Sequence, residues 1–197
     1  MIMNNNSSQI RLHWTKVILS GTLAWGVAIG TTTYAQSKSL PTVEKVELDK
    51  YLGVWYEVAR KPMSFQKQCA RDVLAIYTVN ENGNIAVDNR CYDREGNLQQ
   101  SFGEAFVINE PYNSKFKVSF VPEAVRWIPV GRGDYWILKL DEHYQMALVG
   151  EPTRKYLWVL SRDPHPDEAM VNEYLKYAKS LGYNIKNIIQ IPQTKAK

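Results

Sequence analysis

The chain has 197 residues, of which 45% are hydrophobic and 22% charged, a composition typical of one globular domain and not of a disordered or fibrous protein. Its formal net charge is +4, and the first 35 residues contribute Arg11 and Lys16 but no acidic side chain. The other 22 basic and 20 acidic residues are interspersed without a basic stripe, which excludes a nucleic-acid-binding protein.

The first 35 residues have the three regions of a secretory signal peptide. A positively charged start ends at Lys16, an apolar stretch follows over 17–30, and Thr33 and Ala35 have the spacing that signal peptidase accepts. We therefore predict a signal peptide over 1–35, a mature domain over 36–197, and export to a periplasmic, outer-membrane-associated or extracellular location. The alternative is an uncleaved anchor over 17–35, although a membrane span needs about 20 apolar residues. No cysteine follows the apolar stretch, so anchoring through a bacterial lipoprotein signal is not expected.

From residue 49 onward, short runs of alternating apolar and polar residues are separated by turn residues such as Asn82-Gly83. This alternation predicts an all-β domain, because one face of every strand must cover a shared interior. The predicted strands are 53–60, 71–79, 85–92, 100–108, 115–121, 134–141, 145–150 and 156–162. Such evenly spaced strands are typical of an antiparallel sandwich or barrel.

After the last strand the pattern changes to a helical period. Pro166, Asp167 and Glu168 are typical of a helix start, and apolar residues then recur on one face up to Leu181. Gly182 is placed to end this helix. A final run over 185–191 can add an edge strand. We expect the helix to pack against the outside of the closed sheet.

Cys69 and Cys91 flank a predicted hairpin. Two cysteines in an exported chain are paired more often than free. The register of the hairpin brings Cys91 opposite Val73, so a bulge or bend at the strand start would bring Cys69 within reach. We expect a Cys69–Cys91 disulfide, and two buried free thiols are the alternative.

Three segments resemble the conserved blocks of the lipocalin family in order and spacing; they are Gly53-Val54-Trp55-Tyr56, Gly133-Asp134-Tyr135-Trp136-Ile137-Leu138 and Leu160-Ser161-Arg162-Asp163. In that family these blocks belong to the first, sixth and eighth strands. The resemblance covers roughly residues 46–192. It implies an eight-stranded antiparallel up-and-down β-barrel with one C-terminal α-helix packed outside.

Four residues of these blocks are predicted to be structural. Gly53 lets the backbone bend as the chain enters the barrel. Trp55, followed by Tyr56, closes one end with a large apolar side chain. Arg162 can place its guanidinium over the Trp55 ring, a cation–π contact worth about 0.5–2 kcal/mol.

The resemblance also implies that the barrel binds and carries or stores a small hydrophobic ligand. Its bacterial branch suggests a fatty acid or lysophospholipid and a role in maintaining cell-envelope lipids. Strict alternation along the strands predicts which residues line the cavity: Glu57, Ala59, Ala75, Tyr77, Val87, Asn89, Ala105, Val118, Phe120, Tyr135, Ile137, Val149, Tyr156 and Trp158. A buried carboxylate at Glu57 would need a partner, for which Arg60 and Lys139 are the candidates.

The two predicted ends of the barrel differ in charge. The open-end loops 60–72, 92–99, 121–134 and 150–155 hold nine basic and six acidic residues, whereas the closed-end turns hold one basic and four acidic residues. A cationic mouth favours a ligand with an anionic head, or peripheral contact with an anionic membrane. We place Arg126, Arg132 and Trp127, from the longest loop, among the ligand-contacting residues. Ordinary solvated loops are the alternative.

No enzymatic motif is found in the sequence. His143 and His165, the histidines beyond residue 35, have no nucleophile or metal-ligand partner at a suitable spacing, and no cofactor or metal is expected. We therefore expect a protein that is not an enzyme. A free Cys91 on the inward face would instead allow a cysteine-dependent lipid isomerase. A third possibility is a protein-interaction module that uses Trp127 and the 121–134 loop, or a homodimer.

Overall fold

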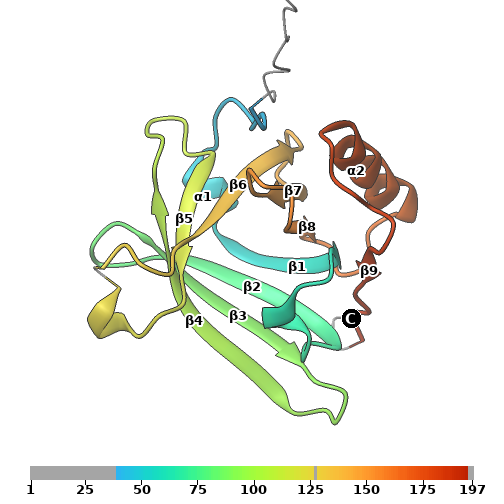
Figure 1. The fold of residues 1–197 in the computed structure, drawn as a ribbon, viewed down its shortest axis with the longest axis horizontal. Helices are drawn as coiled ribbons and strands as arrows, with labels where there is room; N and C mark the ends of the chain where they lie inside the picture. The colour runs from blue at the N-terminus through green and yellow to red at the C-terminus, as the bar shows by residue number, and fades with distance from the viewer. Residues whose placement is uncertain (1–38, 127, 195–197) are drawn as a thin grey trace, which may run out of the picture. The chain divides into compact units, whose positions relative to one another are not determined.

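The computed structural model describes residues 39–126 and 128–194, so the predicted signal peptide and Trp127 lie outside the described residues. The strands of the barrel are β1 Gly53–Arg60, β2 Arg71–Val79, β3 Ile85–Tyr92, β4 Leu98–Val107, β5 Lys115–Ser119, β6 Gly133–Leu140, β7 Met146–Gly150 and β8 Leu157–Ser161. Each strand pairs antiparallel with the next, and β1 pairs with both β2 and β8, which closes the barrel (Figure 1). The predicted fold is confirmed, and every predicted strand end lies within two residues of the observed end.

The helix α2, Glu168–Ser180, follows the barrel as predicted. Its N-cap is Asp167, whose Oδ1 accepts a hydrogen bond from the backbone N–H of Ala169 at 2.8 Å. Gly182 follows the helix at φ 91°, a conformation that favours glycine. In the part of the chain that the structure describes, no helix is long and apolar enough to cross a membrane.

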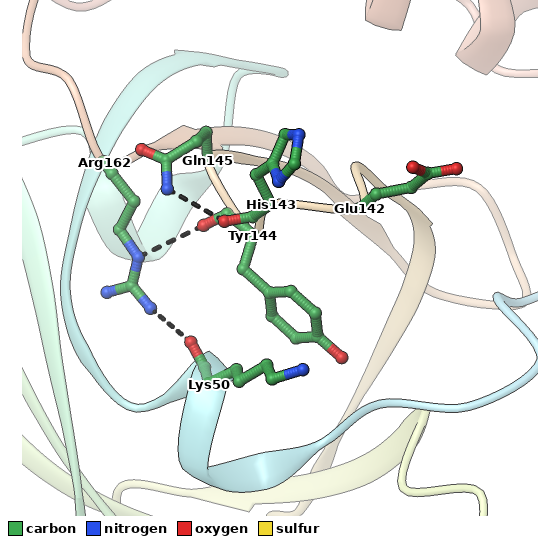
Figure 2. A pocket seen from close by; sticks show the side chains of 6 residues that line it. All are labelled: Lys50, Glu142, His143, Tyr144, Gln145 and Arg162. Carbon is green, nitrogen blue, oxygen red and sulfur yellow. Dashed lines mark hydrogen bonds between the residues drawn. The ribbon is translucent and has the colours of Figure 1, made fainter.

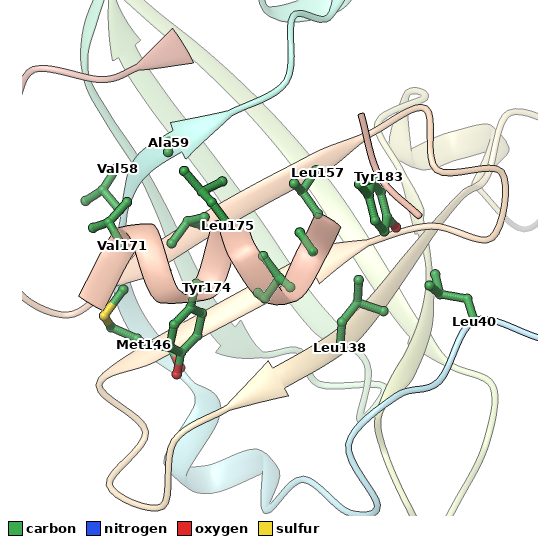
Figure 3. Close-up of a cluster of buried hydrophobic side chains, with 13 residues drawn as sticks. Leu40, Val58, Ala59, Leu138, Met146, Leu157, Val171, Tyr174, Leu175 and Tyr183 are labelled. Atoms are coloured by element: carbon green, nitrogen blue, oxygen red, sulfur yellow. The ribbon is translucent and has the colours of Figure 1, made fainter. Parts of the chain in front are cut away.

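The helix packs on the outer face of the barrel through a set of residues that we call the helix cluster (Figure 3). Its buried members are Leu40, Val58, Ala59, Leu138, Met146, Leu148, Leu157, Val159, Val171, Tyr174, Leu175, Ala178 and Tyr183. The predicted edge strand is present as β9, Ile189–Gln190, which pairs with the end of β1. The outside position of the helix is therefore confirmed.

A second set of buried side chains, the interior cluster, fills the closed half of the barrel. Its members are Val46, Tyr51, Trp55, Ala75, Tyr77, Ile85, Val87, Ala105, Phe116, Ile137, Ala147, Val149 and Leu160. Tyr51 comes from the short helix α1, Leu48–Tyr51, which precedes β1. The two clusters lie on opposite faces of the same strands, as the alternation predicts.

A β-bulge in β1 changes which side chains face the interior. Glu57 pairs with Leu160 of the interior cluster, whereas Ala59 pairs with Val159 of the helix cluster. The extra residue reverses the alternation, so that Val58 and Ala59 both face the helix. The prediction that Ala59 lines the cavity is wrong. Arg60 pairs with the inward-facing Trp158, so Arg60 takes the interior position.

The predicted disulfide between Cys69 and Cys91 is present, with 5.5 Å between the Cα atoms. It joins the loop between β1 and β2 to the end of β3. This loop contains the short 3-10 helix η1, Ser64–Gln66. The register of β2 and β3 shifts between Arg71 and Leu74, which is the irregularity that the pairing requires. The pairing removes the free thiol that a cysteine-dependent isomerase would need.

Candidate ligand-binding site

The closed end of the barrel is sealed by Trp55, whose side chain is fully buried. The guanidinium of Arg162 lies 3.9 Å from the centre of the Trp55 ring, as predicted. Arg162 also donates hydrogen bonds to backbone carbonyls of α1 and of the junction with β1, including those of Lys50 at 2.9 Å and Leu52 at 2.7 Å. Gly53 adopts φ 92°, which allows the sharp entry into β1. These residues are structural.

A surface pocket of about 430 Å³ lies outside this sealed end and is lined by Lys50, Glu142, His143, Tyr144, Gln145 and Arg162 (Figure 2). Its cations already have partners. Lys50 pairs with Glu47 at 2.8 Å, and the hydrogen bonds of Arg162 go to backbone carbonyls, among them that of Tyr144. The pocket therefore offers no free cation to a ligand.

A column of aromatic rings runs along the barrel interior from the sealed end towards the mouth. Ring centroids are 5.0 Å apart for Tyr51 and Trp55, 5.9 Å for Tyr51 and Tyr77, and 6.3 Å for Tyr77 and Tyr135. The column continues from Tyr135 to Trp158 over 6.4 Å. Large rings along one axis give a ligand an apolar wall at every depth.

Some residues of this wall remain partly accessible although they face the interior of a closed barrel. Val118, Tyr135 and Trp158 are partly exposed members of the interior face, and Asn89 is partly exposed opposite the inward-facing Ala75. Trp55, Ile137 and Val149, in contrast, are fully buried. The barrel interior is thus fully buried at Trp55, Ile137 and Val149 and partly accessible around Tyr135 and Trp158. We call the partly accessible part of the interior the upper cavity.

A buried ion pair lies in the wall of the barrel beside the upper cavity. Arg60 Nη1 donates to Glu57 Oε1 at 2.9 Å, and the two side chains are 3% and 5% exposed. Gln66 from η1 donates to the other oxygen of Glu57 at 3.0 Å and accepts a hydrogen bond from the indole N–H of Trp158 at 3.0 Å. Gln66 therefore ties the loop between β1 and β2 to the interior wall.

The environment of this pair changes the acidity of its carboxyl group. Burial raises the pKa of Glu57, while the charge of Arg60 and hydrogen bonds from Arg60 and Gln66 act in the opposite direction. Of the two predicted partners, Arg60 is the one found. Lys139 lies past a second bulge, opposite the outward-facing Leu148, and pairs with Glu173 of α2 instead.

Most of the predicted cavity residues face the interior, and their contact with a ligand remains a prediction. The interior positions are confirmed for Glu57, Ala75, Tyr77, Val87, Asn89, Ala105, Val118, Tyr135, Ile137, Val149 and Trp158. Ala75 lies at the depth of Trp55, its partner in the sheet, and is 8% exposed. Ala75 is therefore close to the floor.

Two predicted residues lie at the rim. The strand β5 ends at Ser119, so Phe120 leaves the sheet and is 47% exposed. Its ring covers Gly103, where a Cβ atom would lie 2.7 Å from Phe120 Cδ1. Tyr156 precedes β8, and its ring lies between two others. The ring centroids are 6.2 Å apart for Tyr156 and Trp158 and 5.2 Å apart for Tyr156 and Phe65 of η1.

The two loop arginines are engaged by the protein. Arg126 donates to the backbone carbonyls of Val121 and Phe102, at 2.8 and 2.9 Å. The guanidinium of Arg132 lies 3.9 Å from the ring of Phe106, whose partner Lys117 is on the outer face. Arg132 therefore does not face the cavity, contrary to prediction, because the loop folds back over the outside of β4.

Sequence reasoning missed three interior residues. Arg60 faces inward only because of the bulge, Gln66 lies in a turn that would normally be solvated, and Tyr51 precedes the first strand. The only signal in the sequence was the need of Glu57 for a partner. In the described part of the chain, no cluster of side chains has the composition of a metal site.

Comparison with known proteins agrees with this architecture. The profile of the lipocalin-like domain matches residues 46–193. Temperature-induced lipocalin-1 of Arabidopsis thaliana is 36% identical over 81% of this chain and 86% of its own length. The outer membrane lipoprotein Blc of Vibrio cholerae is 34% identical over 79% of this chain and 88% of its own. Apolipoprotein D of Rattus norvegicus is 36% identical over 83% of this chain and 86% of its own length.

Solved structures support the fold independently. Insecticyanin from the tobacco hornworm Manduca sexta superposes with a TM-score of 0.60 at 18% identity, covering 81% of this chain and 87% of that chain. Apocrustacyanin C2 superposes with a TM-score of 0.58 at 14% identity, covering 76% of this chain and 81% of that chain. With a family profile that matches most of its length and relatives above 30% identity, the chain belongs to the lipocalin family.

Proposed function

We propose that this lipocalin carries or stores a small hydrophobic ligand in the upper cavity and is not an enzyme. The observation that carries the proposal is the partly accessible surface of Val118, Tyr135 and Trp158 inside a closed barrel. Apolar and aromatic surface that water reaches only through the mouth gains free energy when an apolar molecule covers it. Family membership supports the same function.

The ligand class that we propose is a fatty acid or a lysophospholipid, in the service of cell-envelope lipid maintenance. The names of the Blc relatives place them at the outer membrane, which supports the envelope role. An acyl chain suits a narrow cavity that ends on the packed layer around Trp55. Its length would be limited by that floor.

We propose also that the mouth contacts anionic membrane surfaces. Phe65, Val125 and Val130 on the mouth loops are 52%, 42% and 73% exposed. Lys67 and Lys155, on loops at the same end, are also exposed. Apolar tips among cations suit a surface with apolar acyl chains below anionic headgroups. Flotation with phosphatidylglycerol vesicles, compared with phosphatidylcholine vesicles, tests this contact; equal recovery in both would contradict it.

Export through cleavage of residues 1–35 is part of the same proposal. The Cys69–Cys91 disulfide supports it, since such bonds persist in oxidising compartments. Amino-terminal sequencing of protein recovered from the cell exterior or periplasm tests it. A start at Gln36 is expected, and full-length chain in the membrane pellet would show an anchor.

The experiment that tests the carrier function is a chain-length series. Mature protein is first examined by native mass spectrometry with organic extraction, which identifies any retained lipid and the oligomeric state. Tryptophan quenching is then followed with saturated fatty acids and lysophospholipids of increasing length. Affinity should rise by about 0.8 kcal/mol for each methylene buried and then level off when the tail reaches the floor.

A pair of variants localises the binding. Val118→Phe fills the upper cavity and should shorten the preferred chain. Thr78→Phe adds the same ring on the exposed outer face of β2 and should leave the series unchanged. Ala75 is less suitable for this test, because a larger side chain beside Trp55 would overpack the floor. Affinity that is indifferent to chain length would contradict the carrier function.

A further inference from the structure

Three tyrosine hydroxyl groups meet at the bottom of the upper cavity. The Tyr135 oxygen lies 2.8 Å from the Tyr51 oxygen and 3.1 Å from the Tyr77 oxygen. The three residues come from distant parts of the chain: α1, β2 and β6. We call this group the phenol triad. The Tyr51 ring lies 5.0 Å from the Trp55 ring, centroid to centroid, which places the triad next to the sealed end.

The phenol triad has more donors than hydrogen bonds. Each hydroxyl has one proton to donate, so the triad has three protons, whereas two hydrogen bonds join its oxygens. Among the described residues no other acceptor is found for these hydroxyl groups. One O–H therefore lacks an acceptor in every arrangement of the protons.

The unpaired proton is best placed on Tyr135. Tyr51 and Tyr77 are 5% and 8% exposed, whereas Tyr135 as a residue is partly exposed. An unpaired donor costs less free energy where water or a ligand can reach it than where it is fully enclosed. Tyr51 and Tyr77 then both donate to the Tyr135 oxygen, and Tyr135 directs its own O–H into the cavity.

The triad is a donor over the whole physiological range. Burial raises the pKa of Tyr77 to about 12 and raises the pKa of Tyr51 and Tyr135 well above 10.0. None of the three phenols becomes an anion near neutral pH. A polar group of a ligand that reaches this depth must therefore accept a hydrogen bond.

The charges around the cavity favour a neutral acceptor. The cation in the wall, Arg60, is already paired with Glu57 at 2.9 Å. Arg162 lies against the Trp55 ring and makes its hydrogen bonds to backbone carbonyls. A carboxylate brought down to Tyr135 would lose its hydration, while both guanidinium groups already have partners. A ketone or ester carbonyl loses much less hydration and accepts the same hydrogen bond.

From this geometry we infer that Tyr135 is a specificity-determining residue that donates a hydrogen bond to a neutral carbonyl oxygen at the inner end of an elongated apolar ligand. The inference rests on the proposed carrier function and narrows its ligand class: a lipid with a ketone or ester near its inner end is bound more tightly than one that ends there in a methyl group or a free acid. An anionic group at the other end of the same molecule could remain at the mouth.

The test compares three ligands of matched shape by tryptophan quenching. They are methyl heptyl ketone, the alkene in which a methylene group replaces its carbonyl oxygen, and nonanoate. The measured quantity is the ratio of ketone to alkene affinity within each protein variant, which is insensitive to small changes in stability. Tyr135→Phe should lower this ratio by about fivefold to tenfold, the effect of one lost hydrogen bond.

Tyr177→Phe is the matched control, because it removes a hydroxyl from a ring on α2, outside the barrel, and keeps the aromatic column. Its ratio should equal that of the wild type. An unchanged ratio in Tyr135→Phe, with ketone and alkene both bound, would overturn the inference and leave the carrier function standing. The inference would also fail if nonanoate bound as tightly as the ketone with the same dependence on Tyr135. If the wild type bound none of the three, both the carrier function and the inference would be contradicted.

Discussion

Arg162 lies partly exposed at the sealed end of the barrel, whereas Arg60 is buried beside the upper cavity. The guanidinium of Arg162 covers Trp55 and donates to backbone carbonyls that precede or begin β1. Arg60 instead pairs with the carboxylate of Glu57, and its buried Nε has no hydrogen-bond partner among the described residues. Both guanidinium groups donate to backbone carbonyls, but only Arg60 also has a carboxylate partner.

The difference shows how one barrel separates stability from recognition. At the sealed end backbone carbonyls accept the hydrogen bonds of the Arg162 guanidinium, and the Trp55 side chain is fully buried. Beside the cavity a carboxylate, an amide and three phenols provide polar groups that are only partly saturated. Substitutions at the first end should change folding, and substitutions at the second should change ligand choice as well.

The largest effect is expected for Trp55→Ala. Removing a fully buried indole from a packed layer should lower the free energy of unfolding by about 3–5 kcal/mol, measured by urea denaturation. Val54→Ala is the control, since Val54 is 39% exposed on the neighbouring position, and it should change stability by less than about 1 kcal/mol. Folded Trp55→Ala that has lost its preference between ligand classes would contradict the separation of the two ends.

A second, smaller effect is expected for Arg60→Met. The variant leaves the Glu57 carboxylate buried without its cation. The free energy of unfolding, measured by urea denaturation, should therefore fall by about 3 kcal/mol. Adding Glu57→Gln to this variant removes the buried charge and should recover part of the loss. If the double variant were less stable than Arg60→Met alone, the pair would not be the source of the effect.

The different outcomes at β1 show what the sequence can and cannot predict. Period-two alternation and turn residues are local signals, which is why the eight strands, the helix and the facing of Tyr77, Tyr135 and Trp158 were predicted correctly. The facing of Ala59 depends on the register between β1 and β8, a long-range pairing that no local pattern encodes. A single bulge therefore exchanged an expected alanine for an arginine in the interior.

The polar part of the site was hidden for a similar reason. Gln66 belongs to a turn, where glutamine is normally solvated, and it reaches Glu57 and Trp158 only because the loop folds back into the mouth. Phe120 was assigned to a strand that ends one residue earlier, at Ser119. The position of Arg132 depends on how the long loop lies across β4. Each of these is fixed by tertiary contacts.

The smallest expected effect is a pH dependence of the free energy of unfolding that arises from Glu57. Because burial raises its pKa in the folded protein above the ordinary 4.5, the folded state binds the proton more tightly than the unfolded state does. The contribution of Glu57 to stability is therefore fully present below pH 4.5 and is lost as the pH rises through the raised folded value. Wild type should gain stability relative to Glu57→Gln as the pH falls across this window. Urea denaturation of both proteins from pH 4 to pH 7 measures the difference.

Glu104 provides the comparison, because its carboxylate should titrate with the opposite sign. Burial acts to raise the pKa of Glu104, but hydrogen bonds from Asn82, Asn84 and Asn80 outweigh this and lower the pKa. Its contribution to stability is therefore present above pH 4.5 and is lost as the pH falls through the lowered value. Wild type should therefore lose stability relative to Glu104→Gln on acidification, whereas it gains stability relative to Glu57→Gln. If both differences had the same sign, the Glu57 carboxyl group would be stabilised as an anion like that of Glu104, and burial would not dominate its environment. Opposite signs would show that the charge beside the ligand is held at a cost in folding free energy, whereas the hydrogen-bonded carboxylate of Glu104 contributes to stability.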